Sequence, residues 1–101
     1  MNNNHSILCV TASGCLESDC EVRNDKSGNK YIQFKMVCST KDMAGQTLYI
    51  PFRCFTYNVK YAKLKKGDIV FVTGEFTCSK LNDKLNFDLY VHQICLGGVK
   101  I

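Results

Sequence analysis

A shared alternation of apolar and polar side chains in two neighbouring segments constrains the fold of this chain most strongly. In residues 30–40 the apolar side chains occupy every second position, and after a polar loop the same even-numbered pattern returns in residues 48–55. A period of two places alternate side chains on opposite faces of a β-strand. The even-numbered side chains are therefore predicted to line a core: Ile32, Phe34, Met36, Cys38, Leu48, Ile50, Phe52 and Cys54.

One strand before this pair, and a helix and two strands after it, complete the predicted order of elements. Residues 6–23 are predicted to form a long strand bent at Gly14, and turn-forming residues 24–29 follow it. Residues 57–66 change to helical spacing, with Tyr57, Tyr61 and Leu64 at positions i, i+4 and i+7. Residues 69–78 and 87–96 are predicted to be two further strands, joined by a polar, basic hairpin loop.

This order predicts an all-β fold, a five-stranded Greek-key barrel of the oligonucleotide/oligosaccharide-binding (OB) type with one short helix between strands three and four. A β-sandwich is the alternative, but it needs about seven strands, which the chain cannot supply alongside a helix. Residues 1–101 are expected to form a single domain of this kind. The apolar runs are far shorter than the roughly 20 residues that cross a bilayer, and no secretory signal opens the chain, so we expect a cytoplasmic protein.

Seven cysteines are many for a chain of 101 residues. Reduced thiols that pack as small apolar side chains are favoured for three reasons. The number of cysteines is odd, no secretory signal precedes them, and most lie among strand residues. Zinc is the alternative, but the chain has no C-x-x-C pair, and His5 and His92 stand far apart in sequence. We therefore predict no metal and no cofactor.

The odd-numbered face of residues 48–55 carries Tyr49, Arg53 and Phe55, where a soluble monomer would normally place small or charged side chains. Exposed bases of a single strand stack on aromatic rings for roughly 1–3 kcal/mol each, and arginine can neutralise a phosphate or stack on a base. Antiparallel pairing would bring Tyr31 and Lys35 to the same face. This face is predicted to be a platform for single-stranded nucleic acid, and an oligomer interface is the alternative use for its aromatic side chains.

Basic loops are expected to flank this platform, because the loops of the OB fold border its ligand groove. The first loop carries Lys41 and Met43, and the last hairpin carries Lys80, Leu81 and Lys84. The lysines of residues 57–66 are interpreted as an ordinary charged outer face. A net charge of +4 favours polyanions only mildly, so the placement of lysines matters more than their number.

Catalysis finds little support in the sequence. The chain lacks a G-x-S-x-G elbow, a phosphate-binding loop and an H-E-x-x-H pair. Cys54 and His92 are a conceivable nucleophile and base, but Cys54 has the parity of the core. We predict a protein that is not an enzyme.

Several motifs resemble those of the bacterial single-stranded-DNA-binding protein family, from about Ser6 to Gly98. Residues 64–76, LKKGDIVFVTGEF, match the family's L-K-K-G-x-x-V-x-V-x-G-x-L stretch. Residues 20–23, CEVR, resemble the end of its first strand, and residues 94–98, ICLGG, resemble the I-x-L-G that closes its barrel. By this resemblance Tyr49 and Phe55 stand where the family stacks bases, and Met43 and Leu81 stand where it has tryptophans.

The resemblance implies a protein that coats single-stranded DNA without strong sequence preference in DNA replication, recombination or repair. It also implies association with the nucleoid and a homodimer or homotetramer joined through the first strand. Family members usually continue into a tail with an acidic tip that recruits repair enzymes, and since this chain stops at Ile101 we do not expect tail-dependent recruitment. The predicted DNA-binding residues are Tyr31, Lys35, Lys41, Met43, Tyr49, Arg53, Phe55, Lys80, Leu81 and Lys84.

Two alternatives stay open at this point. The short chain is also similar to primosomal replication protein N, a tail-less dimeric relative that assists the restart of stalled replication forks. An RNA-binding barrel or an oligomerising scaffold of the same fold is the alternative from a different class. Weak discrimination between single-stranded DNA and RNA would favour the RNA-binding alternative.

Overall fold

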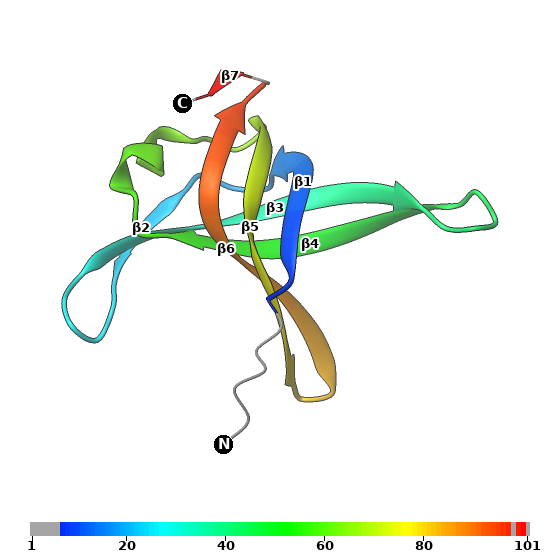
Figure 1. Cartoon of the computed structure of the whole chain (residues 1–101), viewed down its shortest axis with the longest axis horizontal. Helices are drawn as coiled ribbons and strands as arrows, with labels where there is room; N and C mark the ends of the chain where they lie inside the picture. Colours follow the sequence, from blue (N-terminus) through cyan, green and yellow to red (C-terminus); the bar gives the residue numbers. More distant parts are fainter. Residues whose placement is uncertain (1–6, 98, 101) are drawn as a thin grey trace.

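Five strands of this chain close into a barrel, and two short strands extend its sheet (Figure 1). The computed structural model describes residues 7–97 and 99–100, apart from the side chains of Leu81, Val99 and Lys100. No helix within these residues is long and apolar enough to cross a membrane. In chain order the elements are β1 (Cys9–Leu16), β2 (Glu21–Asn24), β3 (Lys30–Lys41), β4 (Thr47–Thr56), the 3₁₀ helix η1 (Val59–Lys63), β5 (Ile69–Leu81), β6 (Lys84–Leu96) and β7 (Val99–Lys100).

Closure of the barrel depends on β1, which pairs with a different strand on each side. β1 runs antiparallel to β5 from Cys9 to Cys15, and its end also pairs with β3, as Cys15↔Val37 and Leu16↔Met36. The other barrel strands follow in the order β5, β6, β4 and β3, with β4 parallel to β6. This arrangement is the five-stranded OB barrel, so the predicted fold class is confirmed.

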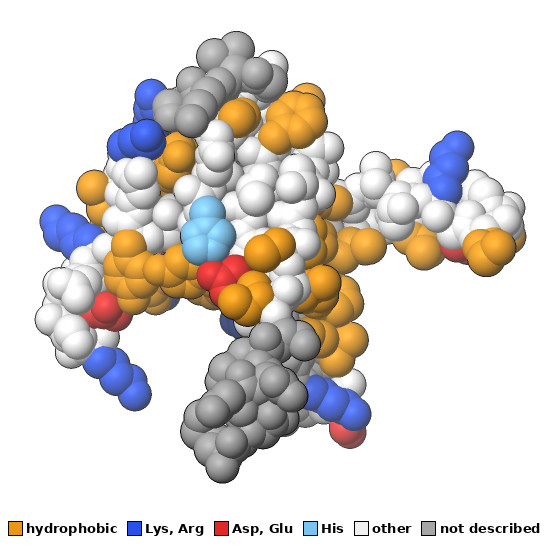
Figure 2. Space-filling view, viewed as in Figure 1, with side chains coloured by type: hydrophobic (Ala, Val, Ile, Leu, Met, Phe, Trp, Pro, Cys, Tyr) orange, Lys and Arg blue, Asp and Glu red, His pale blue; other side chains and the backbone are white. Residues whose placement is uncertain are grey.

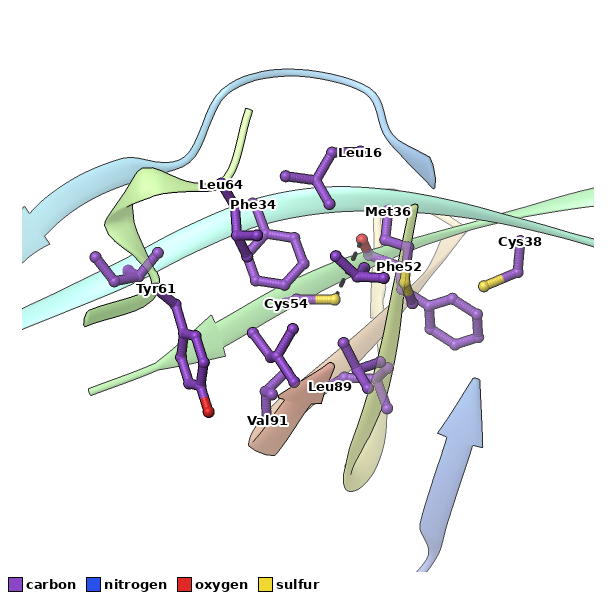
Figure 3. Close-up of a cluster of buried hydrophobic side chains, with 14 residues drawn as sticks. Leu16, Phe34, Met36, Cys38, Phe52, Cys54, Tyr61, Leu64, Leu89 and Val91 are labelled. Carbon is purple, nitrogen blue, oxygen red and sulfur yellow. Dashed lines mark hydrogen bonds between the residues drawn. The ribbon is translucent and has the colours of Figure 1, made fainter. Parts of the chain in front are cut away.

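The core is filled by the even-numbered side chains of β3 and β4, as the alternation predicted (Figure 3). Leu89 and Val91 of β6 face them, and Tyr61 and Leu64 cover one end of the barrel. Leu48 is an exception, because it is exposed and pairs with Thr40 near the end of the β3–β4 hairpin, which extends beyond the barrel (Figure 1). Parity therefore identifies the buried face, but burial ends where the strands leave the barrel.

Three predicted elements differ in detail from the structure. The first strand is interrupted at residues 17–20 and continues as β2, which pairs with β3. The predicted helix is a short 3₁₀ helix that begins after Asn58, so Tyr57 lies outside it. Within this helix only Tyr61 is buried. The last hairpin has no long loop, since Asn82 and Asp83 alone form its turn, both with positive φ.

Pro51 is tolerated in β4 because the strand has one neighbour at that position. It lies opposite Val37 of β3, and the parallel pairing of β4 with β6 begins only at Arg53. Proline lacks the N–H that a central strand would donate, so it is confined to edges and bulges. Within the described pairings, Pro51 stands at such an edge.

All seven cysteines are free thiols, but their positions differ from the expectation that they pack in the core. Only Cys38 and Cys54 are buried, whereas Cys9, Cys15 and Cys78 are exposed. Cys9 and Cys15 point outward from β1, and Cys78 is paired with Phe87 on the β5–β6 hairpin, which projects from the barrel (Figure 1). Burial raises the pKa of the Cys54 thiol strongly, so this thiol stays protonated and inert.

Replacing Gly14 with Ala tests the closure of the barrel. A Cβ atom at this position would lie 2.5 Å from the carbonyl oxygen of Val37 and 2.7 Å from the Cγ of Met36. We expect Gly14→Ala to destabilise the fold by about 1–3 kcal/mol, the usual cost of overpacking. Urea unfolding measures this change, and Ser13→Ala, an exposed neighbour, is the control expected to stay within about 0.5 kcal/mol of wild type. A Gly14→Ala variant as stable as wild type would contradict the close approach.

Candidate nucleic-acid interface

The outer face of β3, β4 and β6 is set by strand register. Gln33 lies opposite Phe55, and Phe55 is paired in turn with Tyr90 across the parallel ladder. The next row along the strands consists of Lys35, Arg53 and Asp88. Side chains that are directly opposite on neighbouring strands point to the same side of the sheet. Outward residues from three strands therefore form one continuous surface.

Aromatic rings run across this surface in an unbroken series, which we call the aromatic strip. Tyr31 lies between two of these rings, with its ring centroid 6.3 Å from that of Phe55 and 5.8 Å from that of Tyr57. Tyr57 is 6.2 Å from Tyr90, and Tyr90 is 5.8 Å from the imidazole of His92. Tyr57 and Tyr90 remain 47% and 44% exposed, so their ring faces are accessible to a ligand.

A hollow of about 500 Å³ lies between the strip and the β2–β3 loop. Hydrophobic side chains gather beside this loop in the space-filling view (Figure 2). The walls of the hollow are aromatic and its rim is polar, which is the usual character of a ligand site. Its lining residues are Asn24, Asp25, Lys26, Tyr31, Phe55, Tyr57 and Tyr90.

Arg53 is on the predicted face, but its charge is already paired. Its Nε donates to Oδ1 of Asp88 at 2.7 Å, and its second guanidinium nitrogen donates to Oδ2 at 3.0 Å. These hydrogen bonds raise the pKa of Arg53 above its usual value. The guanidinium carbon lies 5.9 Å from the centre of the Phe55 ring. Asp88 therefore holds Arg53 beside the Phe55 ring, where the guanidinium extends the aromatic strip while its charge is paired.

Two loops at opposite ends of β3 have the same hydrogen-bonded form. In the β2–β3 loop, Oδ1 of Asp25 accepts from the backbone N–H groups of Ser27 and Asn29, at 2.9 and 2.8 Å. In the β3–β4 loop, Oδ1 of Asp42 accepts in the same way from Ala44 and Gln46, both at 2.9 Å. Each loop has a glycine at its fourth position, with φ of 86° at Gly28 and 85° at Gly45. The local sequence D-x-x-G thus specifies one loop conformation twice.

Asp25 differs from Asp42 in one contact, because its other carboxylate oxygen faces the aromatic strip. The Tyr57 hydroxyl donates to Oδ2 of Asp25 at 3.0 Å. The backbone N–H of Asn29 is the largest cause of a lowered pKa at Asp25, and the Tyr57 hydroxyl adds to it. The same contact raises the pKa of Tyr57. Asp25 therefore remains a carboxylate at neutral pH.

The other end of the strip also carries a hydrogen bond between two side chains. Nε2 of His92 lies 2.8 Å from Oε2 of Glu75 on β5. Because β5 and β6 lose register between Thr73 and Gly74, His92 is the extra residue of a β-bulge and joins Tyr90 on the outer face. A Cβ at Gly74 would lie 2.3 Å from the Tyr90 carbonyl oxygen, so only glycine fits there.

The predicted aromatic platform is divided in the structure. Tyr31 and Phe55 meet in the strip, but Tyr49 lies six residues before Phe55 on β4, which corresponds to about 20 Å along a strand. Tyr49 contributes instead to a second hollow of about 370 Å³, where Ser13, Cys15 and Ile69 also lie. It shares the outward parity of the strip without contacting it.

The predicted basic and loop residues also occupy separate places. Lys35 lies beside Arg53 on the outer face, and Lys84 has the parity of Asp88 and Tyr90. Lys80 is paired with Leu85 on the opposite face of the β5–β6 hairpin. Lys41 ends β3 on the projecting β3–β4 hairpin, Met43 is fully exposed at its tip, and the Leu81 side chain lies outside the described residues.

Sequence reasoning missed Tyr57, Tyr90 and His92. Tyr57 continues the odd-numbered outward series of β4, but its helical spacing with Tyr61 led to its assignment to a helix. Tyr90 and His92 alternate with the buried Leu89 and Val91, so their outward direction was readable from residues 87–96. Their proximity to β4 was not readable, because it depends on a parallel pairing distant in sequence.

Chemistry other than binding has no assembled site in the described part of the chain. Cys54 points into the core (Figure 3), whereas His92 lies on the outer face, so they cannot act as nucleophile and base. Within residues 7–97 and 99–100 no three His, Cys, Asp or Glu side chains gather as metal ligands.

Comparison with known proteins agrees with this geometry. A model of the single-strand binding protein family matches residues 7–101. The chain is similar in structure to a small single-stranded DNA-binding protein from Streptomyces coelicolor, with a TM-score of 0.72, 14% sequence identity, and coverage of 92% of this chain and 95% of that chain. No curated protein sequence matches significantly.

Two further solved structures share the fold. An SSB of Plasmodium falciparum in complex with ssDNA has a TM-score of 0.66 and 17% identity, over 88% of this chain and 89% of that chain. A mitochondrial single-stranded DNA binding protein from S. cerevisiae has a TM-score of 0.65 and 18% identity, over 92% and 96%. At these identities the likeness establishes the shared fold.

Replacing Tyr57 with Phe tests the contact between the strip and the β2–β3 loop. We expect the pKa of Asp25 to rise toward its usual value but to stay below it, because the backbone donors of Asn29 and Ser27 remain. A lowered folded-state pKa stabilises the fold above the unfolded pKa, and this stabilisation is lost as pH falls through the folded pKa. Carboxyl-carbon NMR titration measures the shift, and an unchanged Asp25 pKa would contradict the hydrogen bond.

Proposed function

Since the chain belongs to the single-strand binding protein family, we propose that it coats single-stranded DNA without strong sequence preference. Members of this family bind single-stranded DNA and are not enzymes, as the sequence predicted. The observation that carries the proposal is the aromatic strip, because a series of exposed rings on one face of a barrel offers surfaces on which successive unstacked bases can stack. Every base has a π-face, so stacking of this kind tolerates any sequence.

The charges around the strip support a path for the phosphates. Lys35 is exposed and lies next to the row of Phe55 and Tyr90, and Lys84 shares the outward parity of that row. Arg53, held by Asp88, offers a flat cationic surface for stacking. In this proposal bases stack on Tyr31, Phe55, Tyr57 and Tyr90, while lysines neutralise phosphates.

A homodimer or homotetramer is part of the proposal, because one OB barrel covers only about 4–16 nucleotides. Among the described residues, the edge of β1 before Cys15 has a pairing partner on the β5 side alone. Ile69 and Phe71 expose apolar surface on the neighbouring strand. Sedimentation equilibrium tests this part, and a monomer at concentrations that saturate DNA would contradict it. The role in replication, recombination or repair is likewise proposed.

Binding is tested by fluorescence anisotropy with labelled oligo-dT, the matching duplex and oligo-U. We expect tight binding to oligo-dT and little to the duplex, whose bases are already stacked and inaccessible. Comparable binding to oligo-U would favour RNA binding as the function. If the protein bound none of the three, a nucleic-acid role would be refuted.

Substitutions of Phe55 separate stacking from apolar contact. Phe55→Leu keeps apolar volume but loses the ring, and we expect it to weaken oligo-dT binding by about 1–3 kcal/mol. Phe55→Tyr keeps the ring and serves as the matched control, with affinity near wild type. Equal affinity of the Leu and Tyr variants, with both folded, would rule out stacking at this position.

Salt dependence locates the phosphate contacts. For single strands, each neutralised phosphate contributes about −0.7 to the slope of log K against log salt concentration. Lys35→Gln is expected to make the slope shallower by about 0.7, whereas Lys63→Gln on η1 leaves it unchanged. Equal slopes in the two variants would show that Lys35 does not neutralise a DNA phosphate.

A further inference from the structure

The hollow beside the β2–β3 loop has aromatic walls and a polar rim, which suit a flat ring that carries polar groups at its edge. Its volume of about 500 Å³ is bordered by the rings of Tyr31, Phe55, Tyr57 and Tyr90. Rings that meet at interplanar angles of 42° to 56° form a concave wall rather than a flat stack. A nucleobase that enters this hollow would therefore meet aromatic surface together with the polar groups at the rim.

Two oxygen atoms at this rim are fixed in place and can only accept hydrogen bonds from a ligand. Oδ1 of Asp25 is occupied by two backbone N–H groups of its own loop, whereas Oδ2 receives the Tyr57 hydroxyl. An ionised carboxylate has about four acceptor positions, so Oδ2 keeps one for a ligand. The Tyr57 hydroxyl donates its single hydrogen to Asp25, so toward a ligand in the hollow that Tyr57 lines its oxygen can act only as an acceptor.

The loop itself does not require the second carboxylate oxygen of Asp25. The loop at Asp42 closes through Oδ1 alone, with the same backbone donors and the same glycine conformation. A second carboxylate oxygen on a DNA-binding face repels phosphates, so its position in the hollow needs another explanation. Lys26 at the same rim offsets this repulsion, and the Asn24 amide can either donate or accept and does not discriminate between bases.

Bases differ in what they can offer to a pair of acceptors. Cytosine, adenine and guanine carry an exocyclic amino group, and a carboxylate accepts from the cytosine amine in known recognition. Thymine has one ring N–H between two carbonyl oxygens, and these oxygens would face the two acceptors. We propose that the hollow is a base-selecting subsite, in which Asp25 and Tyr57 accept from an exocyclic amine and disfavour thymine.

This inference rests on the proposed function. It adds a preference for certain bases at one subsite of a protein that otherwise binds single-stranded DNA without sequence preference. The measured quantity is the ratio R of the Kd for oligo-dT to the Kd for oligo-dC of equal length, obtained with the full chain at one salt concentration and neutral pH. The change in R between variants carries the test, because the two oligonucleotides also differ in their own stacking.

Asp25→Asn is the first variant. The loop amides hold the Oδ1 position, so the new NH₂ group replaces Oδ2 and presents a donor that suits thymine. We expect R to fall by about two- to tenfold, the scale of one hydrogen bond. Asp42→Asn removes the same charge from the matching loop, and R should equal that of wild type. Tyr57→Phe keeps the ring, loses one acceptor and should lower R in the same direction.

The outcomes separate this inference from the proposed function. If wild type binds oligo-dT and Phe55→Leu weakens that binding, but R is the same in wild type, Asp25→Asn and Tyr57→Phe, then base selection is refuted and DNA coating stands. An equal fall of R in Asp42→Asn would also overturn the inference, because it would assign the effect to charge alone. If wild type binds neither oligonucleotide, the proposed function and the subsite fail together.

Discussion

Contact between β1 and β3 at Gly14 is the constraint on which the rest of this structure depends. The strands approach so closely that a single methyl group at Gly14 would overlap the backbone of β3. This contact turns an open sheet into a barrel, since it joins the two ends of the strand order. Once the barrel is closed, the even-numbered side chains of β3 and β4 have only the interior available, and the odd-numbered set must face outward.

The candidate binding surface follows from a second, shorter contact, the parallel pairing of β4 with β6. Three residue pairs bring Tyr90 beside Phe55 and Asp88 beside Arg53. Tyr90 beside Phe55 extends the aromatic strip, whereas Asp88 beside Arg53 pairs the charge of the guanidinium. The ligand recognition proposed for this face thus rests on ring surface and on a few exposed lysines, which agrees with the modest net charge of +4.

The two D-x-x-G loops show how far local sequence determines a site. Asp25 and Asp42 build nearly identical loops from nearly identical hydrogen bonds. Only Asp25 lies against the aromatic strip, where Tyr57 engages its second oxygen. A local motif therefore fixes the loop conformation, while the position of the loop in the barrel decides whether its carboxylate faces solvent or a hollow.

The sequence by itself determined the alternation, the order of elements and the outward direction of Tyr31, Lys35, Arg53 and Phe55, because a period of two depends only on local backbone geometry. Only the tertiary structure decided that Tyr57, Tyr90 and His92 complete the strip, that Asp88 neutralises Arg53, and that Tyr49 lies apart. These relations depend on which strands become neighbours and in what register. Whether a residue number is odd or even indicates on which face of its strand the side chain lies. The distance between side chains across the sheet depends instead on pairing between segments far apart in the chain.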